Sequence, residues 1–162
     1  MAARGSYEEL ARHLSGIGAV RREMSRGFPA DCPPASAAVL ALLHKYGEMR
    51  MSRLAELMVI DMSVTSRHVA HTAERGWVER LPDPRDGRSR LLCLTERGRR
   101  QLDTLSEATT EALESFLHDW TDDDIARLNG MLARLRESFG DCRARVTRQD
   151  TPHPAARHCS RK

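Results

Sequence analysis

The chain has 162 residues, of which 40% are hydrophobic and 30% charged, a length and composition that suit about one domain with a modest core. Only seven residues are aromatic, no apolar run reaches the ~18 residues of a membrane span, and the start of the chain lacks the apolar stretch of a secretory signal. We therefore expect a cytoplasmic protein with a core of Leu, Ala, Val and Met, and no association with a membrane.

Charge is unevenly distributed along the chain, although the formal net charge is only +3. Residues 143–162 carry six basic residues and one acidic residue, and they hold almost nothing to bury, so we expect a disordered basic tail. Residues 61–100 hold nine arginines against six acidic residues. A basic stretch in an otherwise acidic body is typical of a nucleic-acid surface, and an ordinary solvated face is the alternative.

Helical periodicity dominates the first half of the chain. One apolar stripe at steps of three and four is formed by Tyr7, Leu10, Leu14, Ile17, Val20 and Met24. It predicts a helix that ends near Gly27, because prolines follow. A second, very apolar helix is predicted from Ser36 to Tyr46, with Gly47 as its stop.

Two closely spaced helices are predicted next. Ser52 is the expected N-cap of a short helix, and Asp61 is the expected N-cap of a helix that runs to Arg75 and closes at Gly76. A tight connection between a short helix and a longer one is typical of a helix-turn-helix.

The spacing of apolar residues then changes from that of a helix to that of a strand. Residues 77–81 and 90–94 read as two short strands, and the turn-rich segment 82–89 (PDPRDGRS) reads as the loop between them. A hairpin directly after a helix-turn-helix indicates a wing.

Two further helices are predicted after the hairpin. Thr95 is a plausible N-cap for a stripe that runs from Leu102 to Trp120, and Thr121 begins another helix with three aspartates in its first turn. The second of these helices has apolar residues in an a/d pattern, namely Ile125, Leu128, Leu132, Leu135 and Phe139.

The order of elements predicts a mainly α protein with a small β-hairpin wing, that is, a winged helix-turn-helix. We expect residues 1–34 to form an N-terminal dimerisation helix and linker, and residues 35–100 to form the DNA-binding lobe. Residues 101–142 would be C-terminal dimerisation helices, and residues 143–162 the tail. The apolar stripes of the terminal helices are too long for a small domain to cover, which favours a homodimer; a fold-back onto the same chain is the alternative.

Three segments resemble the MarR family of bacterial winged-helix regulators: residues 75–80 (RGWVER), 83–89 (DPRDGRS) and 94–98 (LTERG). The resemblance extends over roughly residues 36–100. It implies a triangular homodimer with two winged-helix lobes and a helical dimerisation region. It also implies repression of transcription through pseudo-palindromic operators in double-stranded DNA, relieved by a small-molecule effector, a metal or an oxidant.

The helix from Met62 to Arg75 would then be the recognition helix in the major groove. Its candidate contacts are Ser63, Val64, Thr65, Ser66, Arg67 and His71. Arg67 suits guanine, and Val64 suits a thymine methyl. For the hydroxyl residues, capping or solvation is the alternative, and a metal pair is the alternative for the histidines at 68 and 71. Family members often carry proline near this helix start, so Met62 leaves the operator sequence open.

In the wing, the candidate DNA contacts are Arg85, Asp86, Gly87, Arg88 and Arg90. Arg88 resembles the family's tip arginine that enters the minor groove. We expect Asp86 to hold Arg88 by an ion pair and Gly87 to permit the turn. Ser52 and Arg53 are candidate phosphate contacts at a helix N-terminus. A solvated hairpin tip is the alternative interpretation of the wing residues.

No enzyme or cofactor chemistry is predicted. The sequence holds no phosphate-binding glycine loop, nucleophile elbow or HExxH motif, so we expect neither catalysis, nor a cofactor, nor a metal site. The four cysteines are far apart and are expected to be reduced, and Asp31 beside Cys32 disfavours a redox-sensing thiolate. The family resemblance suggests an effector pocket near His13, His44 and Trp120, which packing explains equally well.

The sequence therefore predicts a homodimeric, sequence-specific DNA-binding repressor. The alternative is a winged-helix protein that binds other proteins, or that binds DNA without sequence preference.

Overall fold

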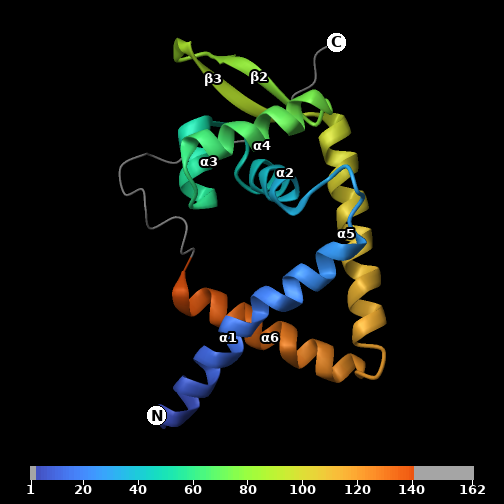
Figure 1. The fold of residues 1–162 in the computed structure, drawn as a ribbon. Helices are drawn as coiled ribbons and strands as arrows, with labels where there is room; N and C mark the ends of the chain where they lie inside the picture. The colour runs from blue at the N-terminus through green and yellow to red at the C-terminus, as the bar shows by residue number, and fades with distance from the viewer. Residues whose placement is uncertain (1–2, 141–162) are drawn as a thin grey trace.

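The computed structural model describes residues 3–140, which form a lobe of short helices and strands with long helices extending from it (Figure 1). The wing lies at one end of the lobe, and α1 and α6 lie at the opposite end of the molecule. The predicted tail, residues 143–162, lies outside the described residues.

Three helices build the lobe: α2 (Pro34–Tyr46), α3 (Met51–Met58) and α4 (Met62–Glu74). All three were predicted, and α2 begins two residues earlier than expected because proline suits the first turn of a helix. Their inward faces meet in one apolar core, whose fully buried members include Val39, Leu40, Leu54, Leu57, Val69, Trp77 and Leu92. Burial of these side chains fixes which face of each helix points to solvent.

The helix starts depart from the predicted capping. Ser52 is the second residue of α3, whose N-cap position is held by Arg50, so the prediction that Ser52 caps this helix is wrong. Asp61 does precede α4, but its side chain makes no capping hydrogen bond. At its other end α4 gives way to Gly76, whose φ of 69° is readily adopted by glycine, as predicted.

An antiparallel sheet of three strands forms the wing. Its strands are β1 (Met49–Arg50), β2 (Val78–Asp83) and β3 (Asp86–Leu94), in the order β1-β3-β2. The predicted hairpin is confirmed, but its strands extend into the segment expected to be a loop. Pro82 pairs with Arg90, which is tolerated because β2 is an edge strand. The two-residue β1 is too short for any periodicity to reveal it.

Long helices flank the lobe: α1 (Arg4–Met24), followed by a 3-10 turn (Ser25–Gly27), then α5 (Glu96–Phe116) and α6 (Asp122–Phe139). The predicted caps of α5 and α6 are confirmed, since the Thr95 hydroxyl accepts from the backbone N–H of Gly98 and Thr121 forms a capping box with Asp124. The apolar stripe expected to continue to Trp120 is interrupted, because α5 ends at Phe116.

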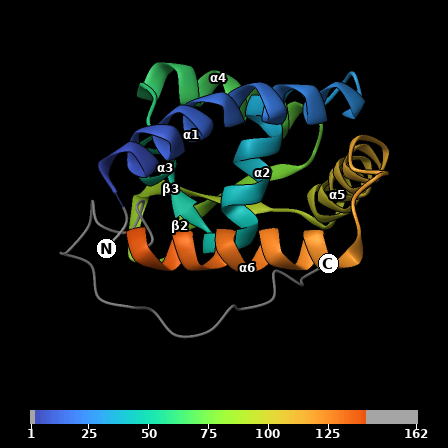
Figure 2. The same ribbon diagram turned by 90° about the horizontal axis from the view of Figure 1, so that it is seen from below.

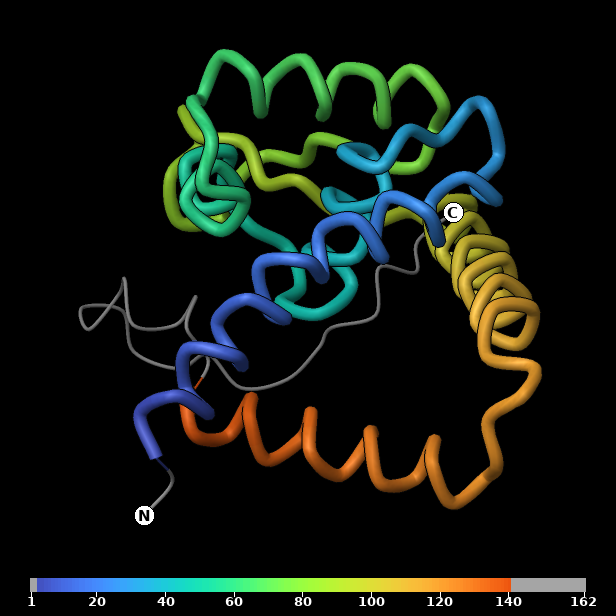
Figure 3. The backbone as a smooth tube through the Cα atoms, turned by 60° about the horizontal axis from the view of Figure 1, so that its bottom comes forward, coloured from blue at the N-terminus to red at the C-terminus, as the bar shows by residue number. Residues whose placement is uncertain are grey.

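The apolar faces of α1 and α6 are uncovered in the single chain. Neither helix has a buried residue. In Figure 2 the two helices run on either side of the chain's other elements, and in Figure 3 α6 (orange) runs apart from α1 (blue) along most of its length, so they do not cover each other. None of the described helices combines the length and the apolar character needed to cross a bilayer.

The start of α5 is fitted closely against the start of the wing. The Thr95 hydroxyl donates to the carbonyl oxygens of Gly76 and Trp77, at 2.7 and 3.1 Å. Gly98 lies in the first turn of this helix, and a Cβ there would overlap the Trp77 carbonyl oxygen and lie 2.7 Å from Leu94 Cδ1. Glycine is therefore required at 98 by space and not by backbone conformation.

We predict that Gly98→Ala lowers the free energy of unfolding by roughly 1–3 kcal/mol, because the new methyl forces α5 away from the wing. Urea denaturation followed by circular dichroism measures the change. The matched control is Gly130→Ala in α6, where the added Cβ meets nothing within 4 Å. That variant is expected to gain about 0.5–1 kcal/mol from helix propensity. Equal effects at the two positions would contradict the close fit at Gly98.

Candidate nucleic-acid interface

The outward face of α4 is polar and carries one exposed arginine. Its inward stripe is Thr65, Val69 and Thr72, all buried, at the i, i+4, i+7 spacing of a helix face. Ser63, Ser66 and Arg67 are exposed on the remaining surface. Arg67 makes no ion pair with any residue in the described range 3–140, so its guanidinium is available to a ligand.

Thr65 is excluded from this surface, which corrects its predicted role in DNA contact. Its side chain is completely buried, and its hydroxyl donates to the Asp61 carbonyl oxygen at 3.0 Å. Val64 is half-buried, so its methyl groups offer a limited surface to a partner. The inward turn of Thr65 follows from helix geometry, because it shares a face with Val69 four residues later.

His71 also lies against the lobe and not on an open surface. Its Nδ1 is 2.9 Å from the Ser36 hydroxyl, and its ring meets the Trp77 ring edge-on with centroids 6.2 Å apart. His68 is half-buried as well. His71 is therefore turned toward the lobe, where it joins α4 to α2, which corrects its predicted role in DNA contact.

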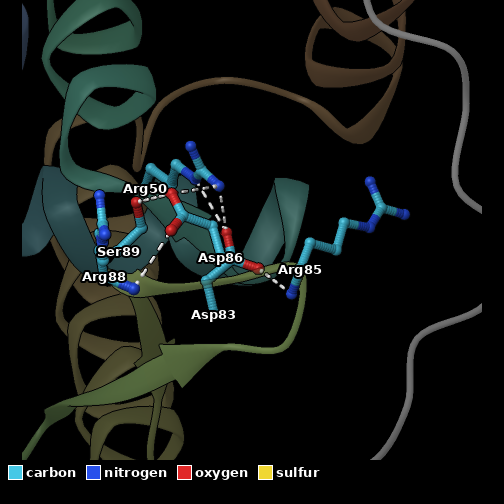
Figure 4. A network of polar contacts seen from close by, with 6 residues as sticks. All are labelled: Arg50, Asp83, Arg85, Asp86, Arg88 and Ser89. Atoms are coloured by element: carbon cyan, nitrogen blue, oxygen red, sulfur yellow. Dashed lines mark hydrogen bonds and ion pairs between the residues drawn. The ribbon is translucent and has the colours of Figure 1, made fainter.

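The wing tip consists of two successive turns, each closed by an aspartate. Asp83 Oδ1 accepts the backbone N–H of Arg85 at 2.9 Å, and Asp86 Oδ1 accepts the backbone N–H of Arg88 at 3.1 Å (Figure 4). The Ser89 hydroxyl donates to Asp86 Oδ2 at 2.7 Å. Aspartate commonly accepts a hydrogen bond from the backbone two residues on, so the repeated Asp-x-Arg pattern encodes this shape.

Arg50 joins the wing tip to the helix-turn-helix. Its Nε and Nη2 donate to Asp83 Oδ2 at 2.8 and 2.6 Å, and its Nη2 lies 3.6 Å from Asp86 Oδ2. Figure 4 shows the Arg50 side chain reaching both carboxylates. Because Arg50 ends β1 and directly precedes α3, this wing network of Arg50, Asp83, Asp86 and Ser89 fixes the hairpin tip relative to the helices.

Hydrogen bonding stabilises the ionised form of both aspartates. The pKa of Asp83 is lowered chiefly by the Arg85 backbone N–H and next by the Arg50 side chain. The pKa of Asp86 is lowered chiefly by the Ser89 hydroxyl and next by the Arg88 backbone N–H. Both carboxylates are thus negatively charged and already engaged at neutral pH, and they are directed toward the wing's own backbone.

The arginine side chains at 88 and 90 are exposed. Neither makes an ion pair with another residue in the range 3–140. The predicted ion pair between Asp86 and the Arg88 guanidinium is wrong, because Asp86 holds the backbone N–H of Arg88 instead. The chain turns at Pro84–Arg85, and the Arg85 side chain extends away from the network in Figure 4.

Gly87 lies between Asp86 and Arg88, but it does not adopt the turn conformation that would require glycine. It lies within β3 and has no left-handed backbone. The regular pairing of β2 with β3 ends at Pro82 and Arg90, and the register shifts beyond it, so residues 87–89 bulge from the strand. This bulge brings Arg88 out of the regular ladder at the wing tip.

Of the other predicted contact residues, some are exposed and one is paired with a residue of its own helix. Ser52 is exposed in the first turn of α3, while Arg53 is half-buried and paired with Glu56 at 3.0 Å. His13, His44 and Trp120 are all exposed and do not converge on the groove of about 360 Å³ at the junction of α1 and α2. That groove is lined by Gly18, Arg21, Arg22, Ser25, Arg26 and Pro34.

Arg50 and Asp83 are the site residues that the sequence reasoning missed. Asp83 is only 6% exposed although it lies between two prolines in a turn-rich segment. Its spacing to Arg85 was the available signal, because aspartate favours such turns. Arg50 carried no comparable signal, since its pairing with Asp83 depends on a contact across 33 residues.

Comparisons with known proteins agree with this geometry. A family model described as the MarR family matches residues 33–89. The HTH-type transcriptional regulator YxaD of Bacillus subtilis (strain 168) is 28% identical over 123 residues, which are 76% of this chain and 86% of that protein. The HTH-type transcriptional repressor IacR of Pseudomonas putida is 30% identical over 94 residues, 58% of this chain and 56% of IacR.

Among solved structures, a mutant MarR from E. coli complexed with operator DNA is similar with a TM-score of 0.59 and 23% identity. The likeness covers 80% of this chain and 96% of that one. At this identity the likeness shows a shared fold.

We predict that Asp83→Asn lowers the free energy of unfolding at neutral pH, because it removes the ion pair with Arg50. The pKa of Asp83 is lowered in the folded state. The stabilisation of the fold by the Asp83 carboxylate is therefore complete above the ordinary pKa of an aspartate, and it is lost as pH falls through the lowered value. The difference between the wild type and the variant should therefore shrink in acid.

Urea denaturation at a series of pH values tests this prediction. Asp103→Asn on α5 removes the same charge at an exposed position and should leave the stability nearly unchanged. A difference between wild type and Asp83→Asn that stays constant down to strongly acidic pH would contradict the role of the carboxylate.

Proposed function

We propose that the chain is a member of the MarR family and acts as a cytoplasmic, homodimeric transcriptional repressor that binds a pseudo-palindromic operator in double-stranded DNA. The observation that carries the proposal is that Arg67 of α4 and the arginines of the wing lie at one end of the lobe. The exposed face of α4 and the arginines of the wing are held in a fixed relation by Arg50.

In this proposal α4 enters the major groove. A recognition helix presents its N-terminal residues to base edges, which distinguish all four base pairs there. Ser63 and Ser66 supply hydroxyl groups, and Arg67 supplies a planar guanidinium that fits guanine O6 and N7. Their exposure, and the lack of an ion pair at Arg67 within residues 3–140, support this assignment.

The wing then reaches the adjacent minor groove through Arg88. A narrow A·T-rich minor groove concentrates negative potential, so one arginine there senses groove shape without reading each base. The bulge at residues 87–89 and the backbone hydrogen bond from Arg88 to Asp86 support this role, because they hold the residue outside the strand ladder. Arg85 and Arg90 would contact the flanking phosphates.

Dimerisation would cover the apolar faces of the terminal helices. In α1 the exposed apolar side chains are Tyr7, Leu10, Leu14, Ile17 and Val20, and in α6 they are Leu128, Met131, Leu132 and Phe139. A single chain that leaves such long stripes open is typical of an oligomer. Residues 1–34 and 101–142 would thus form the dimerisation region, and residues 35–100 the DNA-binding lobe.

The similar proteins support the choice of repression through operator DNA. IacR is a transcriptional repressor by name, and the similar MarR structure holds operator DNA. A small-molecule effector remains an expectation from the family, and the exposed positions of His13, His44 and Trp120 do not define where it would bind.

Selection of bound duplexes from a random DNA pool, at near-physiological salt, tests the proposal. We expect a pseudo-palindrome whose half-sites are about 10–10.5 base pairs apart, the spacing of two recognition helices on one face of the duplex. A pool without enrichment, together with binding that disappears as salt rises, would instead favour non-specific binding or a protein-binding winged helix.

We predict that Arg88→Ala weakens binding to the selected operator by roughly 1–3 kcal/mol without loss of folding. The reason is the loss of the exposed guanidinium from the minor groove, and fluorescence anisotropy at fixed salt measures it. Arg127→Ala on α6 is the control, because it removes the same charge at an exposed position at the far end of the molecule. Equal affinity of Arg88→Ala and wild type would contradict the wing assignment.

A further inference from the structure

A small apolar patch is exposed at the connection between α3 and α4. It consists of Val59, Ile60 and Met62, whose side chains are 82%, 36% and 51% exposed. The other large apolar residues that are exposed within the described chain all lie in α1, in α6, or in the segment from the end of α5 to Trp120. The turn patch is therefore separate from the surface that dimerisation would cover.

Val59 occupies this turn at a conformational cost. It has a φ of 57°, and it is the one non-glycine residue in the described chain with a positive φ. A β-branched side chain rarely adopts this left-handed conformation, which glycine or asparagine would adopt more easily at the end of a helix. The fold alone would thus favour a different residue at position 59.

The patch adjoins the surface of α4 that we assign to DNA. Met62 is the first residue of α4 and directly precedes Ser63, and it lies one helical turn from Ser66, so the two share a side of the helix. Both serines are exposed. The N-terminal end of a recognition helix is the part that contacts base edges, so the patch lies beside the bases in a bound operator.

The size and chemistry of the patch indicate which group it would contact. Three side chains are far fewer than the 20–30 residues per partner of a stable protein interface. In the major groove, the apolar group that a base pair presents is the C5 methyl of thymine. A small apolar surface that continues a polar reading face fits that methyl group.

We propose that the turn patch, chiefly through Met62, reads thymine methyl groups in each operator half-site. This inference rests on the proposed function, since it specifies which bases that site prefers. Contact with a methyl group buries apolar area without requiring a hydrogen bond, and Met62 can adapt to the methyl position because its side chain is unbranched and flexible.

Replacement of single thymines by deoxyuridine in the selected operator tests the proposal, because deoxyuridine lacks only the C5 methyl. For the wild type we expect an affinity loss of about fourfold at one or more positions per half-site, the factor for one buried methyl-sized group. In Met62→Ala that loss should disappear, while the selected operator is still preferred over random DNA.

The control variant is Glu74→Ala, which truncates an exposed side chain at the other end of α4 and should keep the deoxyuridine penalty. A second variant, Val59→Asn, should raise Tm by relieving the left-handed valine, yet reduce the penalty. This pairing of a more stable fold with weaker thymine discrimination is not expected from a purely structural role.

A wild type that selects an operator but shows no deoxyuridine penalty would overturn the inference and leave the proposed function intact. A penalty that persists in Met62→Ala would also overturn it, since the methyl groups would then be read elsewhere. Failure to select any operator would overturn both the inference and the proposed function.

Discussion

The contact between Arg50 and Asp83 is the interaction on which the candidate interface depends. Arg50 precedes α3, and Asp83 closes the first turn of the wing tip, so one guanidinium joins elements separated by 33 residues. Beyond β1 the wing tip is a two-stranded hairpin, which has little core of its own to orient it. The ion pair contributes to that orientation, and the wing and α4 lie at the same end of the lobe.

In the wing, the aspartates are hydrogen-bonded within the protein, whereas arginines are exposed to solvent. Its aspartates accept hydrogen bonds from the backbone, from Ser89 and from Arg50, and the pKa of each is lowered as a result. Arg88 and Arg90 remain exposed. A segment with nearly balanced charge thus presents a basic outer surface, because its aspartates are bonded within the wing. Basic surfaces bind phosphate-rich partners such as nucleic acids.

The sequence predicted most of the fold and part of the site, for identifiable reasons. Helices were found because apolar periodicity is local, and the caps at Thr95 and Thr121 were found because capping needs only four residues. The roles of Thr65 and His71 were predicted wrongly because helix polarity alone does not show which face the core buries. The Arg50 contact was missed because long-range pairing leaves no local signal.

Hydroxyl-radical footprinting of the full chain on its selected operator tests most directly the claim that each lobe of a dimer reads DNA through α4 and the wing together. We predict two symmetric sets of protected sugars, each including a minor-groove segment outside the central major-groove contacts, with centres about 10–10.5 base pairs apart. One uninterrupted protected stretch, or protection confined to a single half-site, would contradict it.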